Sequence, residues 1–146
     1  MMNEIDNTDD LIDIRTVIAR FEDLEQELES SYESDADEDK PELAQWIAGL
    51  AHEGNDTAEE YQRLLALLEE CKGNGGDEQW RGDWYPVTLI RDSYFKEYAQ
   101  DLADEIGAVD ANAGWPMSCI DWDQAARELR MDYTAVEFDG ETYWTR

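Results

Sequence analysis

Negative charge is the strongest constraint on what this chain can fold into. Its 146 residues contain 38 Asp and Glu against 11 Lys and Arg, which leaves a formal net charge of −27. A chain with this much charge stays disordered unless it has enough apolar surface to bury. Six Trp, seven Tyr and three Phe supply such surface, and the chain is long enough for one useful core. We therefore expect a folded polyanion and not a disordered acidic tail.

The charge also limits the partners. Nucleic acids and anionic membranes are bound through Lys and Arg, so we expect neither as a direct ligand. Opposite potentials attract, which favours a basic protein partner. The simpler alternative is that the charge secures solubility or reflects a salt-adapted host, although about 2 to 8 net charges suffice for solubility. The acidic start of the chain and the lack of a long apolar run predict a cytoplasmic protein.

Three segments of the first half repeat apolar residues at intervals of three and four, as amphipathic helices do. In the first of them the apolar stripe runs from Leu11 to Leu28. In the third, Thr57 and Glu60 have the spacing of a capping box. The predicted helices cover about 10–30, 42–53 and 58–72.

A glycine-rich stretch at 73–76 predicts a boundary between an acidic helical segment, 1–76, and a small α+β domain, 77–146. The first segment has 22 acids and 5 bases, and the second has 16 acids and 6 bases. Aromatic and β-branched residues between Trp80 and Ile90 then predict an edge strand or a strand with a bulge, because glycine and proline interrupt them.

Two further helices and a hairpin are expected after this strand. Asp92 or Ser93 is placed to cap the first helix, and Asp121 to cap the second, with a loop over 108–117 between them. Asp139-Gly140 separates two strand-like runs and predicts a type I′ turn. The predicted fold class is therefore α+β, with an acidic helical half packed on or joined to a small α+β half that ends in a β-hairpin.

Patterns for catalysis or metal binding are weak. His52 is the only histidine, and the sequence has no Gly-x-Ser-x-Gly motif whose serine it could activate. Cys71 and Cys119 lack the spacing of a metal site. Asp121-Trp-Asp123 could hold a cation, but a helix cap explains Asp121 more economically. The aromatic residues of the second half could line a pocket, yet a core is the favoured interpretation. We predict no catalytic, cofactor-binding or metal-binding residue and no cofactor, and an enzyme is the third hypothesis.

One stretch of the first half contains many acidic residues and no basic residue to neutralise them. Between Glu22 and Asp39 there are ten acids and no base. A helix over these residues would span about 27 Å, or one charge per about 2.7 Å. This spacing lies between that of duplex DNA, about 1.7 Å per charge, and that of a single DNA strand, about 3.4 Å per charge. Residues 31–40 are either a continuation of this helix or a solvated loop.

Three sequence motifs follow one another in the second half and together resemble a known family. They are DSYFKEYAQDLADEIGAV at 92–109, CIDWDQAAREL at 119–129 and DGETYW at 139–144. Over about residues 84–146 the chain resembles phage and prophage proteins related to the ArdA antirestriction family. The resemblance implies a non-enzymatic, elongated, dimeric DNA mimic that blocks DNA-binding defence complexes, type I restriction-modification enzymes being the familiar target. The family's Ala-Tyr-Asn-x-Gly strand motif is absent, which leaves a restriction enzyme, a CRISPR effector or another basic nucleic-acid-handling complex open as the target.

The hypothesis is thus a DNA-mimic inhibitor that occupies the basic channel of a nucleic-acid-binding host complex. Its carboxylates would replace phosphates against Arg and Lys. The predicted contact residues are Glu22, Glu25, Glu29, Glu33, Asp35, Asp37, Glu38 and Asp39, with Asp101, Asp104 and Glu105 as a second patch. The alternative is an acidic structural or adaptor protein that binds a partner through the apolar stripe of its first helix.

Overall fold

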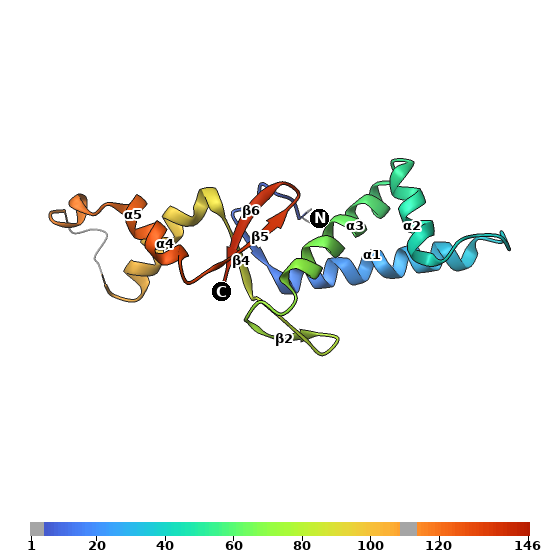
Figure 1. Ribbon diagram of the computed structural model, residues 1–146, viewed down its shortest axis with the longest axis horizontal. Helices are drawn as coiled ribbons and strands as arrows, with labels where there is room; N and C mark the ends of the chain where they lie inside the picture. Colours follow the sequence, from blue (N-terminus) through green and yellow to red (C-terminus); the bar gives the residue numbers. More distant parts are fainter. Residues whose placement is uncertain (1–4, 109–113) are drawn as a thin grey trace.

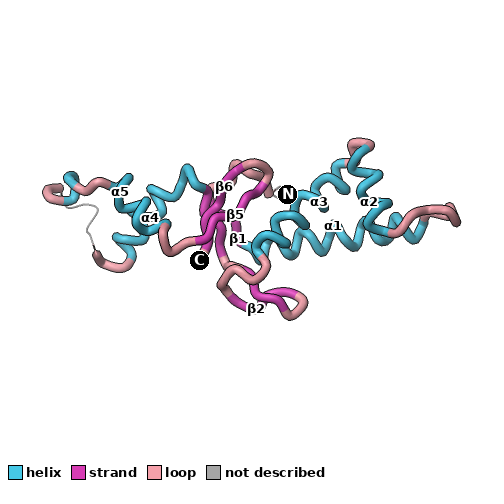
Figure 2. The backbone as a smooth tube through the Cα atoms, viewed as in Figure 1, coloured by secondary structure: helices cyan, strands magenta, loops and turns pink. Residues whose placement is uncertain are grey.

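The computed structural model describes residues 5–108 and 114–146 and has the predicted α+β fold. Its described residues form an elongated molecule in which a central sheet lies between two groups of helices (Figure 1). The tube view shows the same division (Figure 2). On one side of the sheet lie α1 (Ile14–Ser34), α2 (Leu43–His52) and α3 (Asp56–Cys71), and on the other α4 (Phe95–Glu105) and α5 (Trp122–Arg130).

The central sheet has four antiparallel strands in the order β1-β4-β6-β5. They are β1 (Leu11–Asp13), β4 (Thr88–Arg91), β6 (Glu141–Thr145) and β5 (Thr134–Phe138). The prediction of a helix from residue 10 is wrong at this point, because Ile12 pairs with Leu89 in the sheet. Helix α1 starts only after Asp13, whose carboxylate accepts the amide N–H of Arg15 and so caps the helix.

The three N-terminal helices are confirmed, with changed ends. Helix α1 continues to Ser34, four residues beyond its predicted end, and residues 35–42 connect it to α2. The acidic stretch is therefore helical up to Ser34 and a loop beyond it. Serine and glutamate residues are tolerated in the last turns of α1 because the apolar stripe, and not the exposed faces, holds the helix to the protein.

The capping box predicted for α3 is wrong. The N-cap is Asn55, whose side-chain oxygen accepts the amide N–H of Ala58 at 3.0 Å. Glu60, expected to bond back to the helix start, instead turns toward Arg20 of α1. An opposite charge on a neighbouring helix thus outcompetes the local backbone for this carboxylate.

The single strand expected between Trp80 and Ile90 is divided. β2 (Asp77–Trp80) and β3 (Asp83–Tyr85) form a separate hairpin with a register shift between Glu78 and Trp80, which precedes Gly82 and Pro86, the positions from which the sequence predicts a bulge. Its turn is Arg81-Gly82, with φ angles of 52° and 79°. β4 follows and lies between β1 and β6, so it is an interior strand and not an edge.

The C-terminal hairpin and the cap of α5 are as predicted. Asp139 and Gly140 have φ angles of 49° and 85°, both positive as a type I′ turn requires. The carboxylate of Asp121 accepts the amide N–H of Gln124 at the start of α5. Of the predicted loop 108–117, residues 109–113 lie outside the described residues, and Met117 begins a 3₁₀ turn.

The predicted cap of α4 is wrong. Asp92–Tyr94 form a 3₁₀ turn before the helix, and neither Asp92 nor Ser93 accepts a helix amide. The carboxylate of Asp92 accepts the indole N–H of Trp144 at 2.8 Å and pairs with Arg130 at 3.1 Å. It therefore joins the start of α4 to β6 and α5.

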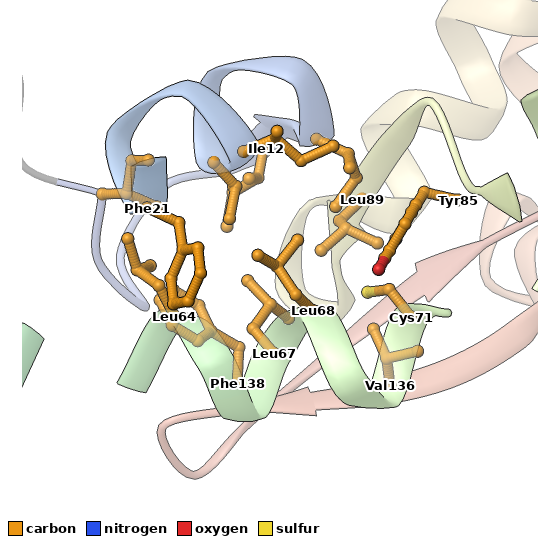
Figure 3. Close-up of a cluster of buried hydrophobic side chains, with 14 of the residues drawn as sticks. Ile12, Phe21, Leu64, Leu67, Leu68, Cys71, Tyr85, Leu89, Val136 and Phe138 are labelled. Atoms are coloured by element: carbon orange, nitrogen blue, oxygen red, sulfur yellow. The ribbon is translucent and has the colours of Figure 1, made fainter. Parts of the chain in front are cut away.

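One hydrophobic core joins the two sequence segments. Side chains of α1 and α3, among them Phe21 and Leu64, point toward each other (Figure 3). Phe138 and Tyr143 of the C-terminal hairpin belong to the same cluster. A smaller cluster around Phe95 fills the space between the other face of the sheet and α4 and α5. The division expected at residue 76 therefore does not separate two cores.

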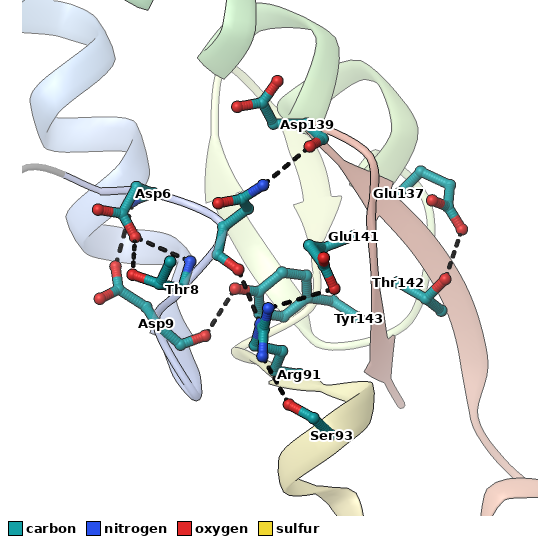
Figure 4. A network of polar contacts seen from close by, with 11 residues as sticks. Asp6, Thr8, Asp9, Arg91, Ser93, Glu137, Asp139, Glu141, Thr142 and Tyr143 are labelled. Carbon is teal, nitrogen blue, oxygen red and sulfur yellow. Dashed lines mark hydrogen bonds and ion pairs between the residues drawn. The ribbon is translucent and has the colours of Figure 1, made fainter.

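Polar contacts fasten the segment before β1 to the C-terminal hairpin (Figure 4). The hydroxyl of Tyr143 donates to the carbonyl of Asp9 at 2.6 Å, and the guanidinium of Arg91 donates to the carbonyl of Asn7 at 2.7 Å. Burial raises the pKa of Tyr143 to about 12, so its phenol remains a donor even at a pH where an exposed tyrosine ionises. Arg91 also pairs with Glu141 of β6 at 3.3 Å.

Two leucines of the predicted stripe test this core. Leu24 is 1% exposed and Leu11 is 49% exposed. We expect Leu24→Ala to lower the free energy of unfolding by about 2–5 kcal/mol, because it leaves a cavity. Leu11→Ala is the matched control and should cost no more than about 1 kcal/mol. Denaturant unfolding followed by circular dichroism measures both, and equal losses would contradict the assignment of the core.

Candidate functional site

The helical part of the acidic stretch has a high density of exposed charge. Six acids lie along α1 between Glu22 and Glu33, over about 17 Å, which gives one charge per about 2.8 Å. Glu22, Glu29 and Glu33 share one face, because steps of three and four residues return to the same side of a helix. All three are exposed, and none forms an ion pair with a described residue. This face of α1 is the centre of the candidate site.

Glu25 lies on the same line but is engaged in the fold. Its carboxylate pairs with Arg81 at 2.6 Å, and its side chain is 24% exposed. The guanidinium of Arg81 also lies over the ring of Trp80, 4.0 Å from its centroid. Glu25 therefore fixes the β2–β3 hairpin to α1, and we remove it from the predicted contact surface.

The acids after α1 lie in an ordered loop. The carboxylate of Asp35 accepts the amide N–H of Asp37 at 3.0 Å and the indole N–H of Trp46 at 3.3 Å. These two hydrogen bonds hold the pKa of Asp35 below its usual range. Lys40 donates to the carbonyls of Tyr32 and Asp35, so the one base of the loop folds back on it. The acids that stay exposed are Asp37, Glu38 and Asp39.

The second predicted patch is separate from the first. Asp101, Asp104 and Glu105 are exposed on α4, which lies on the opposite side of the sheet from α1 (Figure 1). The structure therefore does not bring the eleven predicted residues together. It places acidic surface at both ends of an elongated molecule.

A bidentate ion pair fixes the helix that carries the main site. The Nε and Nη2 atoms of Arg20 each donate to a different carboxylate oxygen of Glu60 at 2.8 Å. Glu60 is only 9% exposed. The guanidinium holds the pKa of Glu60 below its usual range, and the same contact raises the pKa of Arg20. Helix α1 is thus tied to α3 on the core side of its acidic face.

Other chemistry has little support among residues 5–108 and 114–146. These residues contain no group of three or more His, Cys, Asp and Glu placed to hold a metal ion. Burial raises the pKa of the Cys71 thiol to about 12, and Cys119 is exposed. Asp123, suggested above as half of a cation site, pairs with Lys96 at 3.3 Å. None of the helices in this part of the chain is long and apolar enough to span a membrane.

Two tryptophans depart from the expectation that the aromatic residues of the second half form a core. Trp84 is 54% exposed and Trp115 is 81% exposed. Tyr85 and Tyr143, by contrast, are buried in the main cluster. Alternation along β3 could have indicated the exposure of Trp84, because its neighbours Asp83 and Tyr85 point to the other face.

The chain matches no protein-family model, no curated protein and no solved structure. The resemblance of residues 84–146 to the ArdA family stays a prediction. The properties that support this site are therefore the charge, the exposure and the rigidity of α1.

The Arg20–Glu60 pair gives a test of that rigidity. Glu60→Gln removes the carboxylate that accepts both hydrogen bonds from the Arg20 guanidinium, so we expect it to lower the free energy of unfolding at pH 7 by about 1–3 kcal/mol. The folded-state pKa of Glu60 is depressed, so the pair contributes fully above the ordinary value of about 4.5. Its contribution is lost as the pH falls through the folded-state pKa.

Glu59→Gln is the matched control, because Glu59 is the exposed neighbour on α3. It should cost a few tenths of a kcal/mol, the size of a helix-dipole effect. Denaturant unfolding from about pH 3 to 8 compares the two variants. If Glu60→Gln showed the same small and pH-independent loss as its neighbour, the pair would not fix α1.

Proposed function

We propose that the protein is a nucleic-acid mimic that inhibits a DNA-binding defence complex by occupying its basic channel. The observation that supports this most is the acidic face of α1. Counted around the whole helix, the six acids of α1 between Glu22 and Glu33 average about one per 2.8 Å, which lies between the charge spacings of duplex and single-stranded DNA. Three of the six, Glu22, Glu29 and Glu33, form the exposed face. The face is exposed and has no base between Glu22 and Asp39 to neutralise it.

The proposed mechanism is the replacement of phosphates by carboxylates. Carboxylates accept charge-assisted hydrogen bonds from Arg and Lys in much the same way as phosphates do. Because α1 is held against α3 and the core, its carboxylates are already arranged before binding. A disordered acidic segment would lose conformational entropy on binding, and this helix avoids much of that cost.

The proposed target is a type I restriction-modification enzyme, with a CRISPR effector as the other complex of the same kind. Both hold nucleic acid through its backbone in basic channels, which a mimic with no bases to read can enter. The preference for restriction comes from the resemblance of the second half to ArdA proteins. The elongated shape of the molecule is in keeping with that interpretation (Figure 1).

The adaptor alternative has less support, because the helical part of its apolar stripe is buried. It requires the apolar stripe of α1, but Val17, Phe21 and Leu24 are at most 1% exposed. Helix α3 and the central sheet cover them. A partner could reach this stripe only if the core opened, so we propose no second function.

Salt dependence tests the electrostatic part of the proposal. Affinity for the target should fall at least about a hundredfold between about 50 and 500 mM salt, because ions screen exposed charges. Duplex DNA should compete for the same site. Binding of the protein to a purified type I restriction enzyme and to a purified CRISPR effector can be measured by titration at each salt concentration. An affinity that stays constant would contradict phosphate mimicry.

Charge reversal tests the location. The triple variant Glu22→Lys, Glu29→Lys and Glu33→Lys should weaken inhibition of DNA cleavage at least about a hundredfold, while each single change has a small effect, because the contacts are distributed. The control changes three exposed acids of the opposite end by the same total charge: Glu97→Lys, Glu128→Lys and Asp132→Lys. Equal effects of the two triple variants would show that net charge, and not the face of α1, is responsible.

A further inference from the structure

The β2–β3 hairpin has an inner face that shows how this protein holds a guanidinium. Arg81 at its turn lies over the ring of Trp80 at 4.0 Å and pairs with Glu25 at 2.6 Å. The ring binds one face of the planar cation, and the carboxylate accepts a hydrogen bond from Nη2 at its edge. Trp80 also packs edge-on against Phe21 of α1, which keeps this arrangement in place.

The outer face of the same hairpin carries a second tryptophan and glutamate. Trp84 of β3 is directly opposite Glu78 of β2 in the strand register. Side chains of such a cross-strand pair point to the same face, with Cβ atoms about 4.5–5.5 Å apart. Trp84 is 54% exposed, and Glu78 is exposed too and forms no ion pair with a described residue. The two side chains thus repeat the Trp80–Glu25 combination toward solvent.

Among the described residues, the cations close to the hairpin in sequence are already engaged, and the guanidinium of Arg146, whose backbone lies beside Gly75, is 5.9 Å from the ring centroid of Tyr133. Lys72 pairs with Asp83 at 3.3 Å, and Arg81 pairs with Glu25 on the inner face. The pair formed by Trp84 and Glu78 can therefore accept a cation from another molecule. An exposed tryptophan on a protein surface is also typical of the residues that dominate binding energy in protein interfaces.

The backbone under Trp84 is fixed, so the ring is presented from a defined position. The carbonyl of Trp84 accepts the amide N–H of Gly73 at 2.8 Å. The side-chain amide of Gln79 donates to the carbonyls of Tyr85 and Pro86 at 2.7 and 3.0 Å. Gly76 permits the close approach, because a Cβ there would lie 1.9 Å from the carbonyl oxygen of Tyr85. The hairpin extends from the side of the elongated body (Figure 2).

We infer that Trp84 and Glu78 form a binding site for an arginine side chain of a protein partner. The guanidinium would stack on the indole ring and donate to the carboxylate, as Arg81 does on the inner face. Arginine is favoured over lysine because its planar group can stack and donate two hydrogen bonds at once, whereas an ammonium is a strongly hydrated point charge. This inference rests on the proposed function, because that proposal is the reason to expect a basic partner. It adds that arginine is the group that the site recognises.

Nine-residue peptides of arginine and of lysine are suitable probes. In the full-length protein, the indole N–H resonance of Trp84, assigned from its loss in Trp84→Phe, should shift on titration with the arginine peptide. Trp84→Ala and Glu78→Gln should each weaken binding of the arginine peptide about 2–5-fold. They should change binding of the lysine peptide less. Trp84→Phe, which keeps an aromatic ring, should retain more affinity than Trp84→Ala.

Trp115→Ala is the control, because Trp115 is 81% exposed and lies outside the hairpin. It should leave both affinities unchanged. Circular dichroism of every variant checks that the fold is kept, and Trp84→Phe keeps the test decisive if Trp84→Ala does not fold. The inference is overturned if the indole resonance does not respond to the arginine peptide, or if both peptides lose affinity equally in Trp84→Ala.

The outcome is separable from that of the proposed function. If inhibition depends on salt and on the acids of α1 but Trp84→Ala binds the arginine peptide normally, mimicry stands and the arginine site fails. If the Trp84 resonance responds to arginine while the α1 triple variant inhibits DNA cleavage normally, the arginine site stands and mimicry by α1 fails.

Discussion

Burial of the apolar side of α1 is the interaction on which the rest of the structure depends. A chain with a net charge of −27 repels itself, and contacts between its surface charges cannot offset that repulsion. The apolar residues of α1 pack against α3 and against one face of the central sheet, and the C-terminal hairpin closes the same cluster. Since the acids lie on the remaining sides of α1, the packing that stabilises the fold also determines which side of the helix presents charge.

The few bases of the chain mainly connect parts of the fold. Arg20 joins α1 to α3, Arg81 joins the β2–β3 hairpin to α1, and Arg91 joins β4 to β6 and to the segment before β1. Arg130 likewise joins α5 to the turn before α4. Each of these guanidiniums neutralises an acid at a structural contact. Glu22, Glu29 and Glu33 of α1, and Asp37, Glu38 and Asp39 of the loop after it, are exposed and form no ion pair with a described residue, which gives the surface its polyanionic character.

Local signals predicted the elements whose partners are close in sequence. The three N-terminal helices, the cap at Asp121 and the Asp139-Gly140 turn all depend on residues within a few positions of one another. The errors occurred where the partner is distant. Glu60 has the local spacing of a capping box but lies opposite Arg20, 40 residues earlier, and Glu25 looks like one more exposed acid until Arg81, 56 residues later, reaches it. Leu11 to Asp13 continue a helical pattern, yet they pair with β4.

The sequence by itself determined that the protein is a folded polyanion, that its class is α+β and that its acids are concentrated along the first helix. These properties follow from composition and short-range periodicity, which do not require knowledge of the topology. Only the tertiary structure decided which acids are exposed, where the acidic helix ends and that both halves share one core. It also decided that Trp84 and Glu78 lie side by side on an exposed face. The physical reason is that ion pairs, strand register and burial depend on distances between residues far apart in the chain, and those distances exist only after folding.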